Sequence, residues 1–197
     1  IHYRPLLSAG QRRFAVGAIG TLRLVLLDAV KHQAAPRWLD AEMPGALWEG
    51  GIHWVHFLAQ LDGGVRRLEG FRPAGAGVPE RTMLLAATLG SGAAATLAYS
   101  WEVPSPLRGL RMSHCYGTRG VLAFESNGLF IRCSGHRNRL HFPGFRAISG
   151  FRAMWAAFLG ALQGSSAPSM TLDLAQRDLA LVERSYHTAA QPANSEG

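Results

Sequence analysis

The sequence predicts an α+β fold in which a large, open, mainly antiparallel sheet carries helices on one face. Strands and helices are segregated along the chain instead of alternating, which is typical of this class. Glycine-rich turns join a series of strands in the middle of the chain. One of these turns, Asn127-Gly128, separates two apolar strands and is the strongest hairpin signal present. Strands connected by such short turns pair antiparallel.

The expected elements follow from hydrophobic periodicity and from turn residues. Residues 6–15 are expected to form a short helix, and residues 46–61 form a second one that ends at Asp62-Gly63-Gly64. The expected strands are Leu22–Val30, Val65–Phe71, Thr82–Leu89, 93–101, 110–116, 120–126 and 129–133, and the closing helices are 149–162 and Leu172–Ala190. With 197 residues in all, we expect one domain over residues 1–190 and a frayed tail over 191–197.

Composition and charge favour a globular protein that binds neither nucleic acid nor a membrane. The net charge is +7, but every basic residue except Lys31 is an arginine, and the arginines are scattered without a nucleic-acid motif. The apolar runs fall far short of the ~18 residues that a membrane span needs. Cys115 and Cys133 lie on expected strands, and we interpret them as reduced core residues of a cytoplasmic protein.

The sheet is expected to have a second apolar face. The strands at 82–89 and 93–101 carry apolar residues on both sides. The face away from the helices is therefore expected either to be covered by another sheet or to mediate self-association.

The segment Gly90-Ser91-Gly92-Ala93-Ala94-Ala95 fits the letter pattern of a dinucleotide fingerprint. That pattern binds a pyrophosphate only between a strand and the N-terminus of a helix, and here a strand follows. We interpret the segment as a hairpin turn, so this sequence contains no Rossmann-type site for a nicotinamide cofactor.

The candidate chemistry lies in the helix expected at 46–61. Glu49, His53 and His56 are spaced four and three residues apart, which places them on one helix face. A carboxylate beside an imidazole orients the ring and raises its basicity, which suits acid–base work on a hydroxyl or carbonyl group. Gly50 and Gly51 each cost about 1 kcal/mol relative to alanine in a helix, which is most easily tolerated if another group approaches the backbone.

Two other interpretations of these residues remain open. The first is a polar helix face with ordinary hydrogen bonds. The second is a zinc site formed by Glu49, His53 and His56, although the spacing differs from the H-E-x-x-H pattern. Tyr3 and Arg4, which precede the first expected helix, either line a pocket or belong to a surface arm.

Several motifs together resemble the glucose–fructose oxidoreductase, inositol dehydrogenase and MocA family. They are, in chain order, Tyr3-Arg4-Pro5, Gly17-Ala18-Ile19-Gly20, Gly45-Ala46-Leu47-Trp48-Glu49-Gly50-Gly51-Ile52-His53, Tyr99-Ser100-Trp101 and Gly117-Thr118-Arg119-Gly120. The resemblance extends from His2 to about Ala190 and covers only the C-terminal domain of the family. The chain begins at Ile1 without an initiator methionine, and we expect either a piece of a longer protein or a processed product.

The resemblance implies an oxidoreductase acting on a sugar, cyclitol or related polyol with NAD or NADP. It implies that His53 is the acid/base and that Glu49 orients it, with His56, Tyr3 and Arg4 as substrate contacts. Glutamate stands at position 49 where the family has aspartate. The cofactor would be bound mainly by an N-terminal Rossmann domain that this sequence lacks, so the chain alone is not expected to be active. A homodimer or tetramer through the sheet face is expected, and the alternative is a stand-alone binding or dimerisation module.

Overall fold

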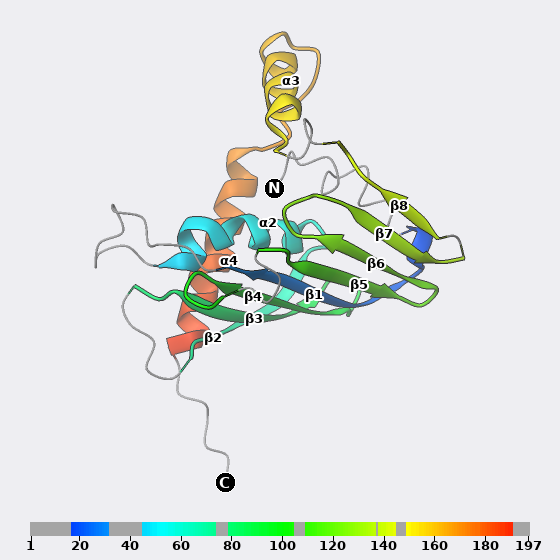
Figure 1. The fold of residues 1–197 in the computed structure, drawn as a ribbon. Helices are drawn as coiled ribbons and strands as arrows, with labels where there is room; N and C mark the ends of the chain where they lie inside the picture. The colour runs from blue at the N-terminus through cyan, green and yellow to red at the C-terminus, as the bar shows by residue number, and fades with distance from the viewer. Residues whose placement is uncertain are drawn as a thin grey trace.

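The computed structural model describes residues 17–31, 45–73, 79–104, 109–136, 138–144 and 149–190 (Figure 1). The expected helix at 6–15, the residues Tyr3 and Arg4, and the tail 191–197 lie outside the described residues. The elements are, in chain order, β1 (Leu22–Val30), η2 (Leu47–Gly51), α2 (Ile52–Ala59), β2 (Val65–Phe71), β3 (Thr82–Leu89), β4 (Ala94–Ser100), β5 (Met112–Gly117), β6 (Gly120–Glu125), β7 (Ile131–Gly135), β8 (Arg139–His141), α3 (Phe151–Leu162) and α4 (Leu172–Ala190).

The eight strands form a single open sheet in the order β2-β3-β4-β1-β5-β6-β7-β8. Only β1 and β4 run parallel, and every other neighbouring pair is antiparallel. The predicted class, an α+β fold with an open and mainly antiparallel sheet, is confirmed. The turn between β3 and β4 contains Gly92 at φ +90°, so the segment that resembled a dinucleotide fingerprint is a hairpin turn, as predicted.

Two elements differ from the prediction. Strand β8 was not predicted, because its three residues are all exposed and show no alternation of burial. The helix expected at 46–61 consists of a π-helical segment, η2, that continues directly into α2. The i→i+5 hydrogen bonding of a π-helix has no signature in hydrophobic spacing, so this change could not be predicted from the sequence.

Helices α2 and α4 cover one face of the sheet, which we call the inner face (Figure 1). Helix α2 packs against both the sheet and α4, and for this reason residues 54–59 are all buried. Its Phe57 ring lies 5.7 Å from that of Phe124 on β6, centroid to centroid. Val182 on α4 is fully buried in the same core.

Helix α3 projects away from the sheet (Figure 1), and none of its residues is buried. Its exposed side chains are large and apolar, and Phe151, Trp155 and Leu162 are each more than half accessible. The apolar spacing at 149–162 therefore predicted a helix correctly, but within the described residues it is not a core helix. No helix in these ranges combines the length and the apolar character needed to cross a bilayer.

The outer face of the sheet carries small and apolar side chains at its centre. The strand register places Leu84, Ala86, Thr96, Leu26 and His114 on this face. Leu26 and Leu84 are 37% and 45% exposed. Among the described residues no helix covers this face, which is the surface that the alternating strands predicted (Figure 1).

Both cysteines lie on strands as predicted, and both are free thiols. Cys115 is buried in β5, and burial raises the pKa of its thiol to about 12. Because the thiolate is the reactive form, Cys115 is an inert core residue.

The contact between β2 and α4 depends on the absence of a side chain at Gly70. A Cβ atom there would lie 2.3 Å from the carbonyl oxygen of Ser185 on α4. We expect Gly70→Ala to lower the free energy of unfolding by about 1–3 kcal/mol, because α4 would have to move off the sheet. Urea unfolding checks this. Gly17→Ala is the matched control, because Gly17 is exposed with no atom within 4 Å, and an unchanged Gly70→Ala midpoint would contradict the packing.

Candidate functional site

A cavity of about 920 Å³ opens on the inner side of the sheet, and four strand ends contribute to it. Strands β1 and β4 run parallel, while β5 runs antiparallel to β1, so the ends of β1 and β4 and the start of β5 meet at one edge. These ends contribute Lys31, Tyr99, Trp101 and Arg111, and the end of β6 contributes Ser126. The other walls come from η2, α2, α4 and the segment around the start of α3.

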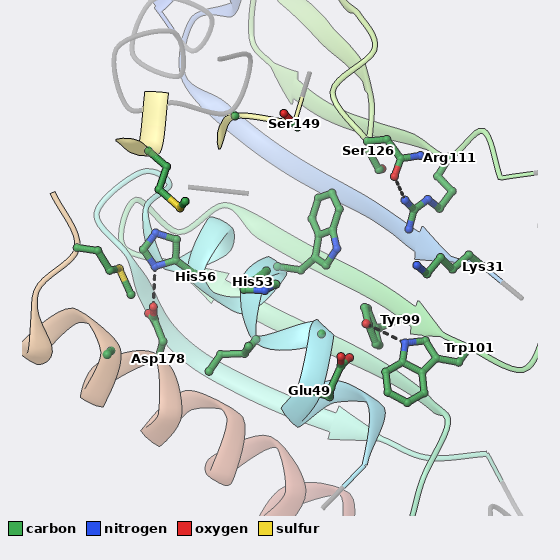
Figure 2. Close-up of a pocket in the computed structure, with 18 of the residues that line it drawn as sticks. Lys31, Glu49, His53, His56, Tyr99, Trp101, Arg111, Ser126, Ser149 and Asp178 are labelled. Carbon is green, nitrogen blue, oxygen red and sulfur yellow. Dashed lines mark hydrogen bonds and ion pairs between the residues drawn. The ribbon is translucent and has the colours of Figure 1, made fainter. Parts of the chain in front are cut away.

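The three polar residues predicted on the helix at 46–61 all line this cavity. Glu49 belongs to η2, whereas His53 and His56 belong to α2. Figure 2 shows Glu49 and His53 in the middle of the pocket, His56 with Asp178 toward one end, and Lys31 with Arg111 toward the other. His53 is exposed, so a molecule in the cavity can reach its ring.

A tyrosine hydroxyl explains the glycine at position 50. A Cβ atom on Gly50 would lie 2.2 Å from the hydroxyl oxygen of Tyr99. The group that approaches this helix closely is thus a side chain of the protein itself. The hydroxyl of Tyr99 accepts a hydrogen bond of 3.0 Å from Trp101 Nε1, and burial raises its pKa to about 12. Tyr99 is therefore protonated at neutral pH and can donate a hydrogen bond at the floor of the cavity.

His56 forms a buried pair with a residue from the C-terminal helix. Its Nδ1 lies 2.6 Å from Oδ2 of Asp178, and both side chains are almost inaccessible. The other carboxylate oxygen of Asp178 accepts a hydrogen bond of 2.7 Å from Arg177. Burial alone would raise the pKa of Asp178, but the hydrogen bonds from His56 and Arg177 lower it below its ordinary value. The carboxylate orients the His56 ring by holding Nδ1 as a donor.

Glu80 holds the segment that carries Glu49 in place. Its Oε1 accepts hydrogen bonds from the backbone N–H of Leu47, at 3.0 Å, and from the hydroxyl of Tyr186, at 2.8 Å. The same hydroxyl accepts a 3.3 Å hydrogen bond from the N–H of Trp48. Burial raises the pKa of Glu80 in spite of these donors. Two backbone N–H groups at the start of η2 thus have side-chain acceptors. The N–H of Leu47 donates to Glu80, which precedes β3, and the N–H of Trp48 donates to Tyr186 on α4.

Arg111 and Lys31 make one end of the cavity cationic (Figure 2). Arg111 is only 7% exposed, and its guanidinium donates to the side-chain oxygen of Asn127. Its Nε is buried and has no hydrogen-bond partner in the described ranges of the chain. Phosphate and carboxylate groups are the ligands that a buried guanidinium recognises best.

Sequence reasoning missed Asp178, Arg111, Lys31 and Tyr99 as parts of this cavity. Asp178 is 122 residues away from its partner His56, and no local pattern links them. Tyr99 was noticed only within a strand motif. Tyr3 and Arg4 lie outside the described residues, so their expected substrate contacts stay predictions. Within the described ranges no group of three or more histidine, cysteine, aspartate or glutamate side chains could hold a metal ion, and this includes Glu49, His53 and His56.

The His56–Asp178 pair is expected to make stability depend on acid pH. Because the folded-state pKa of Asp178 is lowered, its stabilisation is complete above the ordinary pKa of aspartate and is lost as the pH falls from there through the lower pKa of the folded state. Asp178→Asn should lower the free energy of unfolding at neutral pH by on the order of 2 kcal/mol and flatten its acid dependence. Chemical unfolding at several pH values tests this, with exposed Glu183→Gln on the same helix as the control. An unchanged acid profile for Asp178→Asn would contradict the assignment.

Comparison with known proteins identifies the fold. No protein-family model matches the sequence, and no curated protein matches it. Among solved structures, an oxidoreductase from Agrobacterium radiobacter, in complex with NAD+, L-tartaric acid and magnesium, matches with a TM-score of 0.82 at 16% identity over 97% of this chain and 61% of its own. The WlbA dehydrogenase from Bordetella pertussis, in complex with NADH and UDP-GlcNAcA, matches with a TM-score of 0.74 at 17% identity. This match covers 98% of this chain and 63% of the dehydrogenase.

A biliverdin reductase from Synechocystis, in complex with biliverdin and NADP+, matches with a TM-score of 0.70 at 20% identity over 95% of this chain and 60% of its own. The chain thus spans about 60% of the length of the structures that it matches. At these identities the similarity shows the fold alone. The chain has the α+β fold that makes up about 60% of the length of these three oxidoreductases.

Proposed function

We propose that residues 1–190 form the substrate-binding domain of a nicotinamide-dependent oxidoreductase that acts on a sugar, cyclitol or related polyol. The observation that carries this proposal is that Glu49 and His53 line one open cavity together with the Tyr99 hydroxyl. In the proposed reaction His53 accepts the proton of a substrate hydroxyl as that carbon is oxidised to a carbonyl. The reverse reaction returns the same proton.

The supporting residues have distinct roles in this proposal. The carboxylate of Glu49 lies one helical turn before His53 and stabilises the imidazolium that forms when His53 takes the proton. The hydroxyl of Tyr99 is protonated at neutral pH, as in any tyrosine, and donates a hydrogen bond to a substrate oxygen. His56, fixed by Asp178, contacts a second hydroxyl group of the polyol. Several hydrogen-bonding groups on the wall of one cavity suit a ligand with many hydroxyls.

The described residues fit only the reactive end of a nicotinamide cofactor. The cavity is large enough for a sugar and a flat ring, and Trp101 and Phe151 give it aromatic walls. In contrast, the glycine-rich segment at 90–92 is a turn between strands and cannot hold a pyrophosphate on a helix N-terminus. A bound nicotinamide would supply the hydride acceptor, and we propose that a Rossmann domain N-terminal to this chain binds its nucleotide part.

The matched structures support the substrate class. One of them contains L-tartaric acid, a hydroxy acid, and another contains UDP-GlcNAcA, a nucleotide sugar. Each contains a nicotinamide cofactor as well. The biliverdin reductase has the same fold and binds a tetrapyrrole, so the fold by itself does not fix the substrate. The polyol assignment therefore depends on the polar groups of the cavity.

The catalytic assignment is tested in the protein that includes the N-terminal half. His53→Ala should lower kcat by about 10²–10⁴-fold, because the proton of the hydroxyl loses its acceptor. Glu49→Gln should lower kcat less, and Glu49→Asp should restore part of it because the charge returns. The assay follows NAD(P)H absorbance with a panel of sugars, cyclitols and sugar acids.

The control for these variants is His187→Ala, which alters an exposed histidine in the last turn of α4. It should leave kcat and KM unchanged. Undiminished turnover in His53→Ala would refute the role of His53. If the coding sequence upstream of Ile1 lacks a strand–glycine-rich turn–helix unit, a non-catalytic binding module becomes the better proposal.

We also propose that the protein self-associates through the outer face of the sheet, as a dimer or tetramer. An apolar, uncovered sheet centre in a globular protein marks an interaction surface, and a face that pairs with a copy of itself forms a closed symmetric interface. The charged side chains of Glu69 and Arg132 lie in the same register row toward the sheet edges, around the apolar centre.

Introducing charge at the centre of this face tests the proposal. The double variant Leu26→Glu/Leu84→Glu should be a monomer at concentrations where the wild type is an oligomer, because the charges would be buried unpaired in the interface. Light scattering after size exclusion measures the mass. Leu172→Glu, at the exposed start of α4, is the control and should keep the wild-type mass. A monomeric wild type at high concentration would contradict the proposal.

A further inference from the structure

Arg111 is a buried cation to which the described residues supply no ion-pair partner. The residue precedes β5 and is only 7% exposed. None of the ion pairs formed within the described part of the chain involves it. Its Nε is shielded from solvent and finds no hydrogen-bond acceptor among the residues that the structure describes, and the guanidinium donates to Asn127. A buried charge without a counter-charge costs several kcal/mol, so its presence here requires an explanation.

The protein compensates this charge only indirectly. The side chain of Asn127 accepts from Arg111 and donates from Nδ2 to Oε1 of Glu125 at 2.9 Å. The Glu125 carboxylate also accepts from the backbone N–H groups of Asn127, at 2.9 Å, and Leu129, at 3.2 Å. The Glu125 carboxylate is thus hydrogen-bonded to the turn at Asn127. It is linked to the Arg111 guanidinium only through the Asn127 side chain. The remaining side of Arg111 is the cavity, which it lines together with Lys31.

We infer that Arg111 binds an oxyanion of the substrate, so that the substrate is an anionic polyol. This inference rests on the proposed function in taking the ligand to be a polyol, and it adds the chemical group that the cationic end of the cavity recognises. A guanidinium offers a fork of N–H donors that matches a carboxylate or a phosphate. Lys31 adds a second positive charge at the same end of the cavity (Figure 2).

The position of Arg111 would also orient the substrate. Figure 2 shows Arg111 and Lys31 at one end of the cavity and Glu49 and His53 in its middle. An anionic group bound at the cationic end places the chain of hydroxyl-bearing carbons across His53. The oxyanion thereby fixes which carbon lies next to the base, and neutral polyols of the same size lack this anchor.

Three probes that share one sugar ring test the inference on the full 197-residue chain. They are D-glucose, D-glucuronate and D-glucose 6-phosphate, which differ only at the sixth carbon. Isothermal titration calorimetry should show at least about tenfold tighter binding of one or both anions than of glucose. The comparison of the two anions distinguishes a carboxylate from a phosphate. Arg111→Gln should reduce this preference to less than about threefold, whereas Arg184→Gln, which alters an exposed arginine on α4 outside the cavity, should keep it.

Thermal unfolding without ligand separates this role from a structural one. If Arg111 serves binding, Arg111→Gln should keep or raise the Tm, because an uncompensated buried charge disappears. A lower Tm together with an unchanged anion preference would show that Arg111 only anchors the turn at Asn127, and would overturn the inference. Equal affinity for all three probes, or no binding of any, would also overturn it.

The outcome is distinguishable from that of the catalytic proposal, because binding is measured without turnover. His53→Ala should retain the preference for anions in the binding measurement, whether or not this variant still turns over substrate. Rapid turnover of neutral polyols, with no gain for the acids or phosphates, would leave the catalytic proposal standing and refute the role of Arg111.

Discussion

The hydrogen bonds of Glu80 hold the candidate site together, because they join three parts of the chain that are distant in sequence. The carboxylate accepts from the first turn of η2 and from Tyr186 near the end of α4. Its backbone carbonyl also accepts from the N–H of Ala46, at 2.9 Å. The space for this carboxylate exists only because residue 45 is glycine, where a Cβ atom would lie 1.2 Å from Glu80 Oε2. The position of Glu49 and His53 above the sheet thus depends on one buried acid, and burial raises the pKa of that acid above its ordinary value.

Sheet topology explains how residues far apart in sequence reach one cavity. The parallel pairing of β1 and β4 brings Lys31 and Trp101 to the same edge, and the antiparallel β5 begins there with Arg111 before it. Helix α4 then crosses the inner face and supplies Asp178 to His56. A ligand in this cavity would contact elements from both halves of the described chain. The geometry of this site depends on the position of α4, because Asp178 and Tyr186 both lie on that helix and contact His56 and Glu80.

Local patterns in the sequence predicted the elements well and the site only in part. Asn127-Gly128 and the 90–92 glycines predicted hairpins because their turn chemistry is local. The spacing of Glu49, His53 and His56 likewise predicted that they lie together, because all three belong to one helical segment. Arg111, Tyr99 and Asp178 were not, because their importance comes from tertiary burial and from partners up to 122 residues away. The π-helical start of the site helix and the exposed position of α3 also depend on tertiary context that hydrophobic periodicity does not encode.

The contact between Gly50 and Tyr99 links the side chains that these two positions can hold. A side chain at position 50 cannot coexist with the tyrosine hydroxyl, which would lie 2.2 Å from the new Cβ. Loss of the hydroxyl would in turn leave the buried indole N–H of Trp101 without its acceptor. A side chain at position 50 therefore requires a change at position 99, and a chain with alanine at 50 needs a different floor to its cavity. The floor of the cavity thus limits which residues the helix that carries the histidines can hold at position 50.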